Sequence, residues 1–349
     1  MHQPHFGSDN ASGMAPEIID ALARSSAGGV DSYGGDGLTL ALDERFGEIF
    51  ETDVSVLPVG TGTIANALSL AFLAPPWGAI FCYEAAHIVV DEANAPEFFA
   101  GGAKLIGLEG DHGRIHPDAL RRAAATMDAE DVHHPRPSVL SITQASECGT
   151  LYSPNDIGAL CQTARDLGLA VHMDGARFAN AVAALECHPA DMTWRAGVDV
   201  LSFGATKNGC LAAEAIIVFG DRRKEVPVLR RHHKRAGQLF SKMRFLSAQL
   251  DAYLESGNWL RWARNANVQA RRLAHGLEKI EGVRLLHPVG VNEIFLEMPL
   301  AIFERLKRTG FGFYPIQPTG QDTGTVRLVT SFNTSSDDID RLLLAASTD

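Results

Sequence analysis

Two charged side chains follow apolar segments in a way that suggests shared chemistry. Asp174 comes directly after the apolar run Leu169–Met173, and Lys207 comes shortly after the run Val198–Phe203, among small residues. Burying a lysine costs free energy, and a surface lysine is expected among other polar groups. A lysine among small residues after an apolar run is therefore unusual and suggests a function. Taken alone, Asp174 also fits the N-cap of a helix, and Lys207 also fits an exposed loop lysine.

A glycine-rich loop stands upstream of both residues. The apolar segment Val54–Val59 is followed by the loop Gly60–Thr63, where a helix is expected to begin. Glycine allows the backbone to approach a ligand closely, and the free N–H groups and dipole of a helix N-terminus attract an anion. The loop therefore predicts a phosphate site.

The same loop fits two other interpretations. The spacing Gly60-x-Gly62-x-x-Ala65, with Glu84 after the next expected strand, matches a dinucleotide-binding fingerprint, which makes a nicotinamide-dependent oxidoreductase an alternative. Gly, Thr and Ala are also common in any turn from a strand to a helix, so a purely structural turn is the third interpretation.

One cofactor uses all three features together. Pyridoxal phosphate (PLP) needs a lysine for a Schiff base, an acid that faces its pyridine nitrogen, and donors for its phosphate. Lys207, Asp174 and the glycine loop supply these groups in that combination. A dehydrogenase gives no role to the pair of Asp174 and Lys207, so the sequence favours a PLP enzyme.

The segments between these residues predict an α/β fold. Short apolar runs alternate with helical segments, which is typical of a mostly parallel central sheet with helices on both faces. The expected strands are Val54–Val59, Ala79–Tyr83, Ala103–Leu108, Ser138–Thr143, Leu169–Met173, Val198–Phe203 and Ala215–Phe219. The expected helices between them include Thr63–Leu73, Pro117–Ala129 and Pro154–Leu167.

The pattern changes from about Val226, where long helical segments come first and short strands follow. It predicts a smaller C-terminal α+β domain with helices at Leu239–Leu254, Trp259–Ile280, Leu300–Thr309 and Ser336–Ala346, and strands at Val283–Leu286, Asn292–Glu297 and Val326–Val329. We expect a large PLP-binding domain at residues 1–245 and a small domain at residues 246–349, to which the N-terminal segment is a candidate contributor.

Composition excludes several classes of protein. The formal net charge of −11 argues against a nucleic-acid partner. The five cysteines are scattered without a Cys-x-x-Cys pair, so a reducing cytoplasm is expected and neither a disulfide framework nor a metal site is predicted. The N-terminus lacks the pattern of a secretory signal, and the most apolar stretch, Ala65–Cys82, is interrupted by prolines, so no membrane association is expected.

The order of these motifs resembles that of the low-specificity L-threonine aldolases, a family of fold-type I PLP enzymes. The resemblance extends over nearly the whole chain, through the segments Phe6–Asn10, Tyr33–Asp36, Gly60–Asn66, Ala85–His87, His172–Arg177 and Val326–Thr330, with Lys207 between the last two. It implies an α/β fold of the fold-type I PLP-dependent transferase-like class, with PLP as cofactor.

The resemblance implies roles for individual residues around the cofactor. Lys207 would be the Schiff-base lysine, Asp174 the partner of the pyridine nitrogen, and Arg177 the contact to the phenolic oxygen of the ring. Gly62 and Thr63 would bind the phosphate.

Further roles concern the substrate. His87 would stack on the cofactor ring and take part in deprotonating the substrate hydroxyl, which makes it a cofactor-binding and catalytic residue. Ser8 and Arg327 would hold the substrate carboxylate, and Tyr33 would reach the active site of a neighbouring subunit. Each of these residues also has a purely structural interpretation. His87 fits a surface histidine, Ser8 a helix cap, Arg327 an arginine flanking a strand edge, and Tyr33 an aromatic residue in a turn.

The chain departs from the family pattern at two places. Many members carry a second active-site histidine where this chain reads Gln144–Gly149, and Ser146 or Glu147 occupies that region here, which leaves the proton acceptor open. Asp91 stands where other members often have an aromatic residue, and its carboxylate could contact the β-hydroxyl or an ordered water. A phosphate contact from a second subunit is expected near residues 234–244, with Lys242 as a candidate.

The activity implied by the resemblance is retro-aldol cleavage of L-threonine, L-allo-threonine and related L-β-hydroxy-α-amino acids to glycine and an aldehyde. Within the PLP enzymes, the alternatives are a phenylserine-type aldolase or a β-eliminating lyase. Outside them, the glycine loop suggests an NAD-dependent oxidoreductase. A binding protein without activity is a further alternative, which the intact set of Asp174, Lys207 and Arg327 disfavours. A homo-oligomer with active sites at subunit interfaces is expected, with a homotetramer (a dimer of dimers) favoured.

Overall fold

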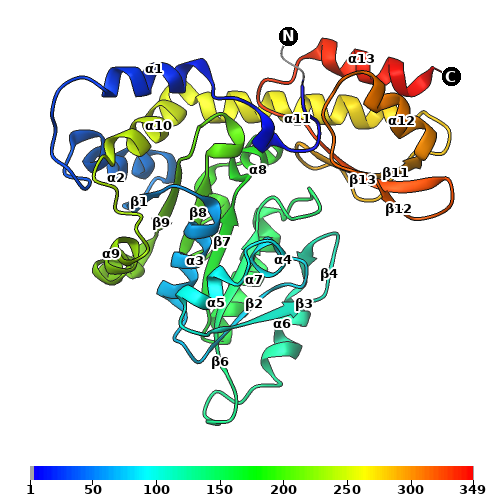
Figure 1. Cartoon of the computed structure of the whole chain (residues 1–349). Coiled ribbons are helices and arrows are strands. Elements are labelled where there is room, and N and C mark those ends of the chain that lie inside the picture. Colours follow the sequence, from blue (N-terminus) through cyan, green and yellow to red (C-terminus); the bar gives the residue numbers. More distant parts are fainter. Residues whose placement is uncertain (1–3, 349) are drawn as a thin grey trace.

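A seven-stranded sheet forms the centre of the computed structural model, which describes residues 4–348 (Figure 1). From one edge to the other its strands are β1 (Ser55–Val59), β9 (Glu214–Val218), β8 (Val200–Gly204), β7 (Ala170–Gly175), β6 (Arg136–Thr143), β2 (Gly78–Tyr83) and β3 (Lys104–Leu108). Only β9 runs antiparallel to its neighbours, β1 and β8, whereas the other adjacent pairs are parallel. The predicted α/β class with a mostly parallel sheet is confirmed.

Both faces of this sheet are buried. Val200 and Ile216 belong to one hydrophobic cluster, whereas the next residues along their strands, Leu201 and Ile217, belong to another. Successive side chains of a strand point to opposite faces, so each face has its own apolar layer. The helices of this region are α1 (Pro16–Ser25), α2 (Gly37–Phe50), α3 (Gly62–Leu73), α4 (His87–Val90), α5 (Ala95–Phe99), α6 (Pro117–Ala124), α7 (Pro154–Asp166), α8 (Phe178–Leu185), α9 (Val226–Arg235) and α10 (Arg244–Leu254).

A second, antiparallel sheet lies in the C-terminal region. Its strands are β10 (Arg284–Leu285), β11 (Glu293–Pro299), β13 (Thr323–Val329) and β12 (Gln317–Pro318), and its helices are α11 (Asn258–Leu277), α12 (Leu300–Arg308) and α13 (Ser336–Ser347). The N-terminal segment joins this sheet, because the Phe6 N–H donates to the Gly312 carbonyl at 2.7 Å and the Phe6 carbonyl accepts from the Val329 N–H at 2.7 Å.

Helix α11 passes from one hydrophobic cluster to another (Figure 1, yellow). Its Trp259 and Trp262 pack in the core of the large sheet, whereas Leu273 and Leu277 pack in the core of the second sheet. The predicted boundary between residues 245 and 246 stays a prediction, and the change of cluster favours a division later, within α11. None of the helices in residues 4–348 has the length and apolar character of a membrane span.

The helix predicted for residues 239–254 begins later, as α10. The preceding residues form a turn, in which the Phe240 N–H donates to the Gln238 carbonyl at 2.9 Å, and they also bond to distant parts of the chain. The Gln238 side-chain oxygen accepts from the Gly60 N–H at 3.0 Å, and the Ser241 carbonyl accepts from the Tyr33 N–H at 3.1 Å. This segment therefore holds the glycine loop in place, which its sequence pattern does not reveal.

Phe46 on α2 anchors the strand that leads to Lys207. Its ring is fully buried and packs edge-on against Phe203 of β8, with ring centroids 5.1 Å apart. We expect Phe46→Ala to lower the free energy of unfolding by about 3–5 kcal/mol, because it leaves a cavity in the core. Urea unfolding measures this change. Leu40→Ala, on the same helix but 68% exposed, should change it by less than about 0.5 kcal/mol, and equal losses for the two variants would contradict the prediction.

Candidate functional site

The strand topology gathers the predicted site residues at one edge of the large sheet. Because β9 runs antiparallel to both β1 and β8, these two strands are parallel to each other, and β7, β6 and β2 run in the same direction. Ligands of open α/β sheets bind outside the carboxyl ends of the strands. The glycine loop follows β1, His87 follows β2, Asp174 lies at the end of β7 and Lys207 follows β8.

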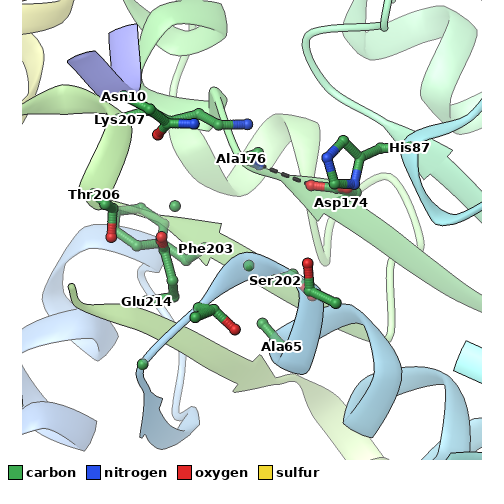
Figure 2. A pocket seen from close by; sticks show the side chains of 15 residues that line it. Asn10, Ala65, His87, Asp174, Ala176, Ser202, Phe203, Thr206, Lys207 and Glu214 are labelled. Carbon is green, nitrogen blue, oxygen red and sulfur yellow. Dashed lines mark hydrogen bonds between the residues drawn. The ribbon is translucent and has the colours of Figure 1, made fainter. Parts of the chain in front are cut away.

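A cavity of about 270 Å³ opens at this edge (Figure 2). Lys207 points across it toward the side where His87 and Asp174 lie. The predicted site residues among those that line it are Gly62, Thr63, His87, Asp174 and Lys207. The structure therefore brings together the three features from which the cofactor was predicted.

The glycine loop presents a helix N-terminus to the cavity. The hydroxyl of Thr61 accepts a hydrogen bond from the Ile64 N–H at 3.3 Å, which starts α3 at Gly62. A Cβ atom added at Gly62 would meet no atom within 4 Å, so the backbone there is open to a ligand. The first N–H groups of a helix have no partner within it, and they favour an anion such as phosphate.

Asp174 is a buried carboxylate held by two donors. Its Oδ1 accepts from the Ala176 N–H at 2.9 Å, and its Oδ2 accepts from the side-chain amide of Asn66 at 2.8 Å. These two bonds fix the plane of the carboxylate at the floor of the cavity. An acid fixed in this way suits a partner whose protonated nitrogen must lie in one place.

The loop that carries Lys207 is fixed on both sides. The Asn208 side chain donates to the hydroxyl of Tyr253 at 2.6 Å, and the Ala205 N–H donates to the Glu214 carboxylate at 2.7 Å. Burial raises the pKa of Glu214 to about 7. Glu214 also lines the cavity, since it begins the antiparallel strand β9 at the edge where the parallel strands end. Lys207 thus projects from a rigid backbone.

His87 lies at the start of the short helix α4, and its ring is held by a hydrogen bond to Glu92. The Nδ1 atom lies 2.9 Å from Oε1 of Glu92, whose side chain is fully buried. This hydrogen bond to Glu92 raises the pKa of His87, against the opposing effect of partial burial. The ring itself remains 40% exposed toward the cavity mouth, so it can meet a ligand.

Glu147, rather than Ser146, faces His87 in the segment that lacks the second histidine. The Glu147 carboxylate accepts from the backbone N–H of His87 at 3.3 Å and from the Thr143 hydroxyl at 2.6 Å. The Ser146 hydroxyl instead bonds to the carbonyl of His112 at 3.2 Å. Of the two residues, Glu147 is therefore the one that contacts His87, although it does not itself line the cavity, and the identity of the proton acceptor stays a prediction.

Glu147 should make the stability depend on pH. Burial raises its pKa to about 7, so the folded chain binds this proton more tightly than the unfolded chain does. The resulting stabilisation is complete below the unfolded pKa and is lost as the pH rises through about 7. Relative to Glu147→Gln, the wild type should lose on the order of 2 kcal/mol of unfolding free energy between about pH 5 and pH 8. Urea unfolding at the two pH values tests this, and parallel pH profiles would contradict it.

Arg177 and Arg327 share one network of ion pairs instead of lining the cavity. Arg177 donates to both carboxylate oxygens of Asp9, at 2.9 and 3.1 Å, and lies 3.1 Å from Glu293. Arg327 approaches the other oxygen of Glu293 at 3.7 Å and donates to the Gly7 carbonyl at 3.2 Å. The predicted contacts of the two arginines to cofactor and substrate stay predictions.

Three other predicted residues lie outside the cavity lining of their own chain. Ser8 is buried and caps a short 3₁₀ helix, where its hydroxyl accepts from the Asn10 N–H at 3.2 Å. Asp91 is exposed at the end of α4. Tyr33 is 52% exposed, with the Lys234 ammonium 4.8 Å from its ring centroid. Their roles toward the substrate stay predictions.

Sequence reasoning missed several polar residues at the site. Asn10, Ser202, Thr206 and Glu214 line the cavity, and Asn66 and Glu92 lie behind it. Asn66 is a polar residue inside the apolar helix α3, and Glu214 begins an apolar strand, so each breaks a pattern and could have been noticed. Asn10 and Glu92 stand in segments without such a pattern, and only the fold identifies them.

Comparison with known proteins agrees with this geometry. The family model described as "Beta-eliminating lyase" matches residues 5–300. The low-specificity L-threonine aldolase of Pseudomonas sp. (strain NCIMB 10558) is 43% identical over 94% of this chain and 93% of its own. The protein of the same name from Pseudomonas aeruginosa is 42% identical over 98% and 95%. The structure of Leishmania major threonine aldolase superposes with a TM-score of 0.92 at 26% identity, covering 98% of both chains.

The dinucleotide interpretation of the glycine loop finds no support. Glu84, the acid that it requires, is exposed and lies outside the cavity lining. The resemblance expected from the motifs is confirmed over nearly the full length of the chain. This chain therefore belongs to the beta-eliminating lyase family and, within it, to the low-specificity L-threonine aldolases.

Proposed function

We propose that this protein is a PLP-dependent aldehyde-lyase that cleaves L-threonine, L-allo-threonine and related L-β-hydroxy-α-amino acids to glycine and an aldehyde. The observation that carries the proposal is the meeting of the glycine loop, Asp174 and Lys207 in one cavity of about 270 Å³. Two relatives with more than 40% identity are named for this activity.

The donor set of the cavity fits PLP. The N-terminus of α3, at Gly62 and Thr63, suits the phosphate, the fixed carboxylate of Asp174 suits the ring nitrogen, and the amine of Lys207 suits the aldehyde carbon. When bound, the cofactor supplies an electron sink for the negative charge that bond cleavage leaves on Cα of the amino acid.

The chain's own residues then have separate tasks. Lys207 would hold the cofactor through its amine. Asp174 keeps the ring nitrogen protonated. His87 covers the ring and accepts the proton of the substrate hydroxyl, directly or through a water, and such positioned proton transfer contributes about 10²–10⁴ in rate.

Arg327 and Ser8 hold the substrate carboxylate in this proposal, with Arg177 toward the phenolic oxygen of the cofactor. A planar guanidinium matches a carboxylate with two parallel hydrogen bonds. The Arg327 side chain is 34% exposed, and its nearest acid, Glu293, lies 3.7 Å away, which is too far for a hydrogen bond. Its guanidinium therefore keeps N–H donors available for a ligand. Asp91 is assigned to the β-hydroxyl or a water beside it.

A homotetramer in the cytoplasm, built as a dimer of dimers, is part of the proposal. Tyr33 and Lys242 are exposed, as residues that reach a neighbouring subunit's site must be in the single chain. The five cysteines are free, in keeping with a reducing compartment. Sedimentation of the purified protein gives the oligomeric state, and a monomer with full activity would refute the shared site.

The decisive experiment is product analysis with the purified, PLP-loaded protein. L-Threonine should yield acetaldehyde and glycine in equal amounts, without oxidation or reduction of a nicotinamide. The matched family is named for β-elimination, which would instead yield 2-oxobutyrate and ammonia. If 2-oxobutyrate is the main product, the cofactor assignment stands and the aldolase assignment fails. Comparing L-threonine with L-phenylserine separates the phenylserine-type alternative.

A further inference from the structure

Glu92 is an acidic residue at a buried position, where a carboxylate costs free energy of folding. Its side chain is fully buried, directly after the short helix α4. Its Oε1 accepts from the Asn66 amide at 2.9 Å and faces Nδ1 of His87 at 2.9 Å. Within residues 4–348 its other oxygen, Oε2, has no hydrogen-bond partner. A buried carboxylate without a full set of donors destabilises the fold, so a function at the residue that it touches is the natural explanation.

The partner of Glu92 is the imidazole that lines the cavity. A neutral histidine carries its proton on one ring nitrogen, and the hydrogen bond made by that nitrogen decides which one. With a carboxylate 2.9 Å from Nδ1, the proton sits on Nδ1 and Nε2 is left as an acceptor. A carboxylate in this position also stabilises the imidazolium that forms when Nε2 takes a second proton.

We propose that Glu92 is a positioning residue that holds His87 in the Nδ1–H tautomer and tunes it as the proton acceptor for the substrate hydroxyl. This inference rests on the proposed function for the step at the hydroxyl. The coupling between Glu92 and His87 does not rest on it. The titratable groups around His87 are Glu92 at its ring, Asp174 and Lys207 across the cavity, and Glu147 at its backbone N–H.

Asn66 extends this pair to the floor of the cavity. Its amide nitrogen donates both of its protons, one to Oε1 of Glu92 at 2.9 Å and one to Oδ2 of Asp174 at 2.8 Å. Because the amide does not pass a proton from one to the other, it holds the two carboxylates as separate groups in a fixed relative position. Asn66 on α3 thereby aligns Asp174, the acid assigned to the cofactor nitrogen, with Glu92, which contacts the assigned base His87.

Glu92→Gln separates charge from geometry. Both hydrogen bonds go to Oε1, so a glutamine whose carbonyl oxygen takes that place keeps them and loses the negative charge, while its NH₂ group replaces the unpartnered Oε2. We expect the pKa of His87 to fall, because the hydrogen bond that raises it no longer goes to a charged carboxylate. The acid limb of the kcat/KM profile for L-threonine should shift by the same amount to lower pH, and its plateau should fall roughly 10²-fold.

Acylation by diethyl pyrocarbonate supplies a readout that is independent of turnover. The reagent attacks neutral imidazole, so the pH dependence of labelling at His87, read by peptide mass spectrometry, gives its pKa. Glu109→Gln is the matched control, since this exposed carboxylate follows the neighbouring strand β3. It should leave both titrations unchanged. If Glu92 only ties α4 to α3, Glu92→Gln will leave them unchanged too, and the proposal is overturned.

A second variant covers the case in which Glu92→Gln does not fold. Glu92→Asp keeps the charge but withdraws it by one methylene, so the rate should fall while the pKa of His87 stays closer to that of the wild type. A rate and a titration both equal to wild type would also overturn the proposal. If the protein does not cleave L-threonine but His87 labelling still shifts in Glu92→Gln, the proposed function fails and the Glu92–His87 coupling stands.

Discussion

Replacing Lys207 by alanine is expected to abolish cleavage of L-threonine, with kcat/KM falling by roughly 10⁴-fold or more. The side chain that projects from the fixed backbone between β8 and β9 would then end at Cβ, and no other amine lines the cavity among the described residues. The variant should keep its fold, because the bonds that hold this loop come from Asn208 and Glu214 and not from Lys207.

Absorbance, borohydride reduction and peptide mapping check this result together. The wild type should be yellow, and reduction should fix a pyridoxyl group on the peptide that contains Lys207. Lys104→Ala, which removes an exposed lysine on β3, should retain the colour and the activity. If the label maps to another lysine, the assignment of Lys207 is wrong, whatever the activity of the variant.

Asp174→Asn is the change with the second largest expected effect. The Ala176 N–H and the Asn66 amide donate to different oxygens of Asp174, so an asparagine, which replaces one of these oxygens by an NH₂ donor, loses one of the two bonds. It also removes the negative charge that stabilises a protonated ring nitrogen. We expect kcat to fall by about 10²–10³-fold, as for the loss of one fixed electrostatic group.

Steady-state kinetics with saturating PLP measure the effect of Asp174→Asn on kcat. The matched control is Asp166→Asn, at the exposed end of α7, the helix that precedes the strand of Asp174. A loss confined to cofactor affinity and cured by excess PLP would show that Asp174 only helps to bind the cofactor. Unchanged kcat would remove it from the reaction.

The sequence predicted the large sheet well because its strands are buried on both faces. A strand such as β8 or β7 is then a mostly apolar run, interrupted only by Ser202 or His172, and a charged residue stands at or shortly after its end, as at Asp174. Since parallel strands end at one edge, the meeting of Asp174 and Lys207 followed from their order in the chain.

Other parts of the fold depend on contacts that leave no local pattern. Helix α6 ends at Ala124, earlier than the predicted Ala129, and α10 starts after a segment whose Gln238 serves the glycine loop. Glu92 escaped notice because its partner Asn66 comes from α3, and because nothing in the five-residue spacing to His87 marks that pair as a contact. Pairwise contacts between distant segments are decided by packing, and a single sequence does not display them.

The network of Asp9, Arg177, Glu293 and Arg327 gives the molecule an internal counter-ion for each arginine. If Arg327 binds the substrate carboxylate as proposed, that carboxylate would meet a guanidinium with an acid already 3.7 Å away and would take the place of Glu293 there. Such an exchange changes little net charge, so binding should be less sensitive to salt than a simple encounter of opposite charges. Asp9 belongs to the N-terminal segment and Glu293 to β11. A change in the bonds of Arg327 would therefore alter the contacts of both regions of the chain.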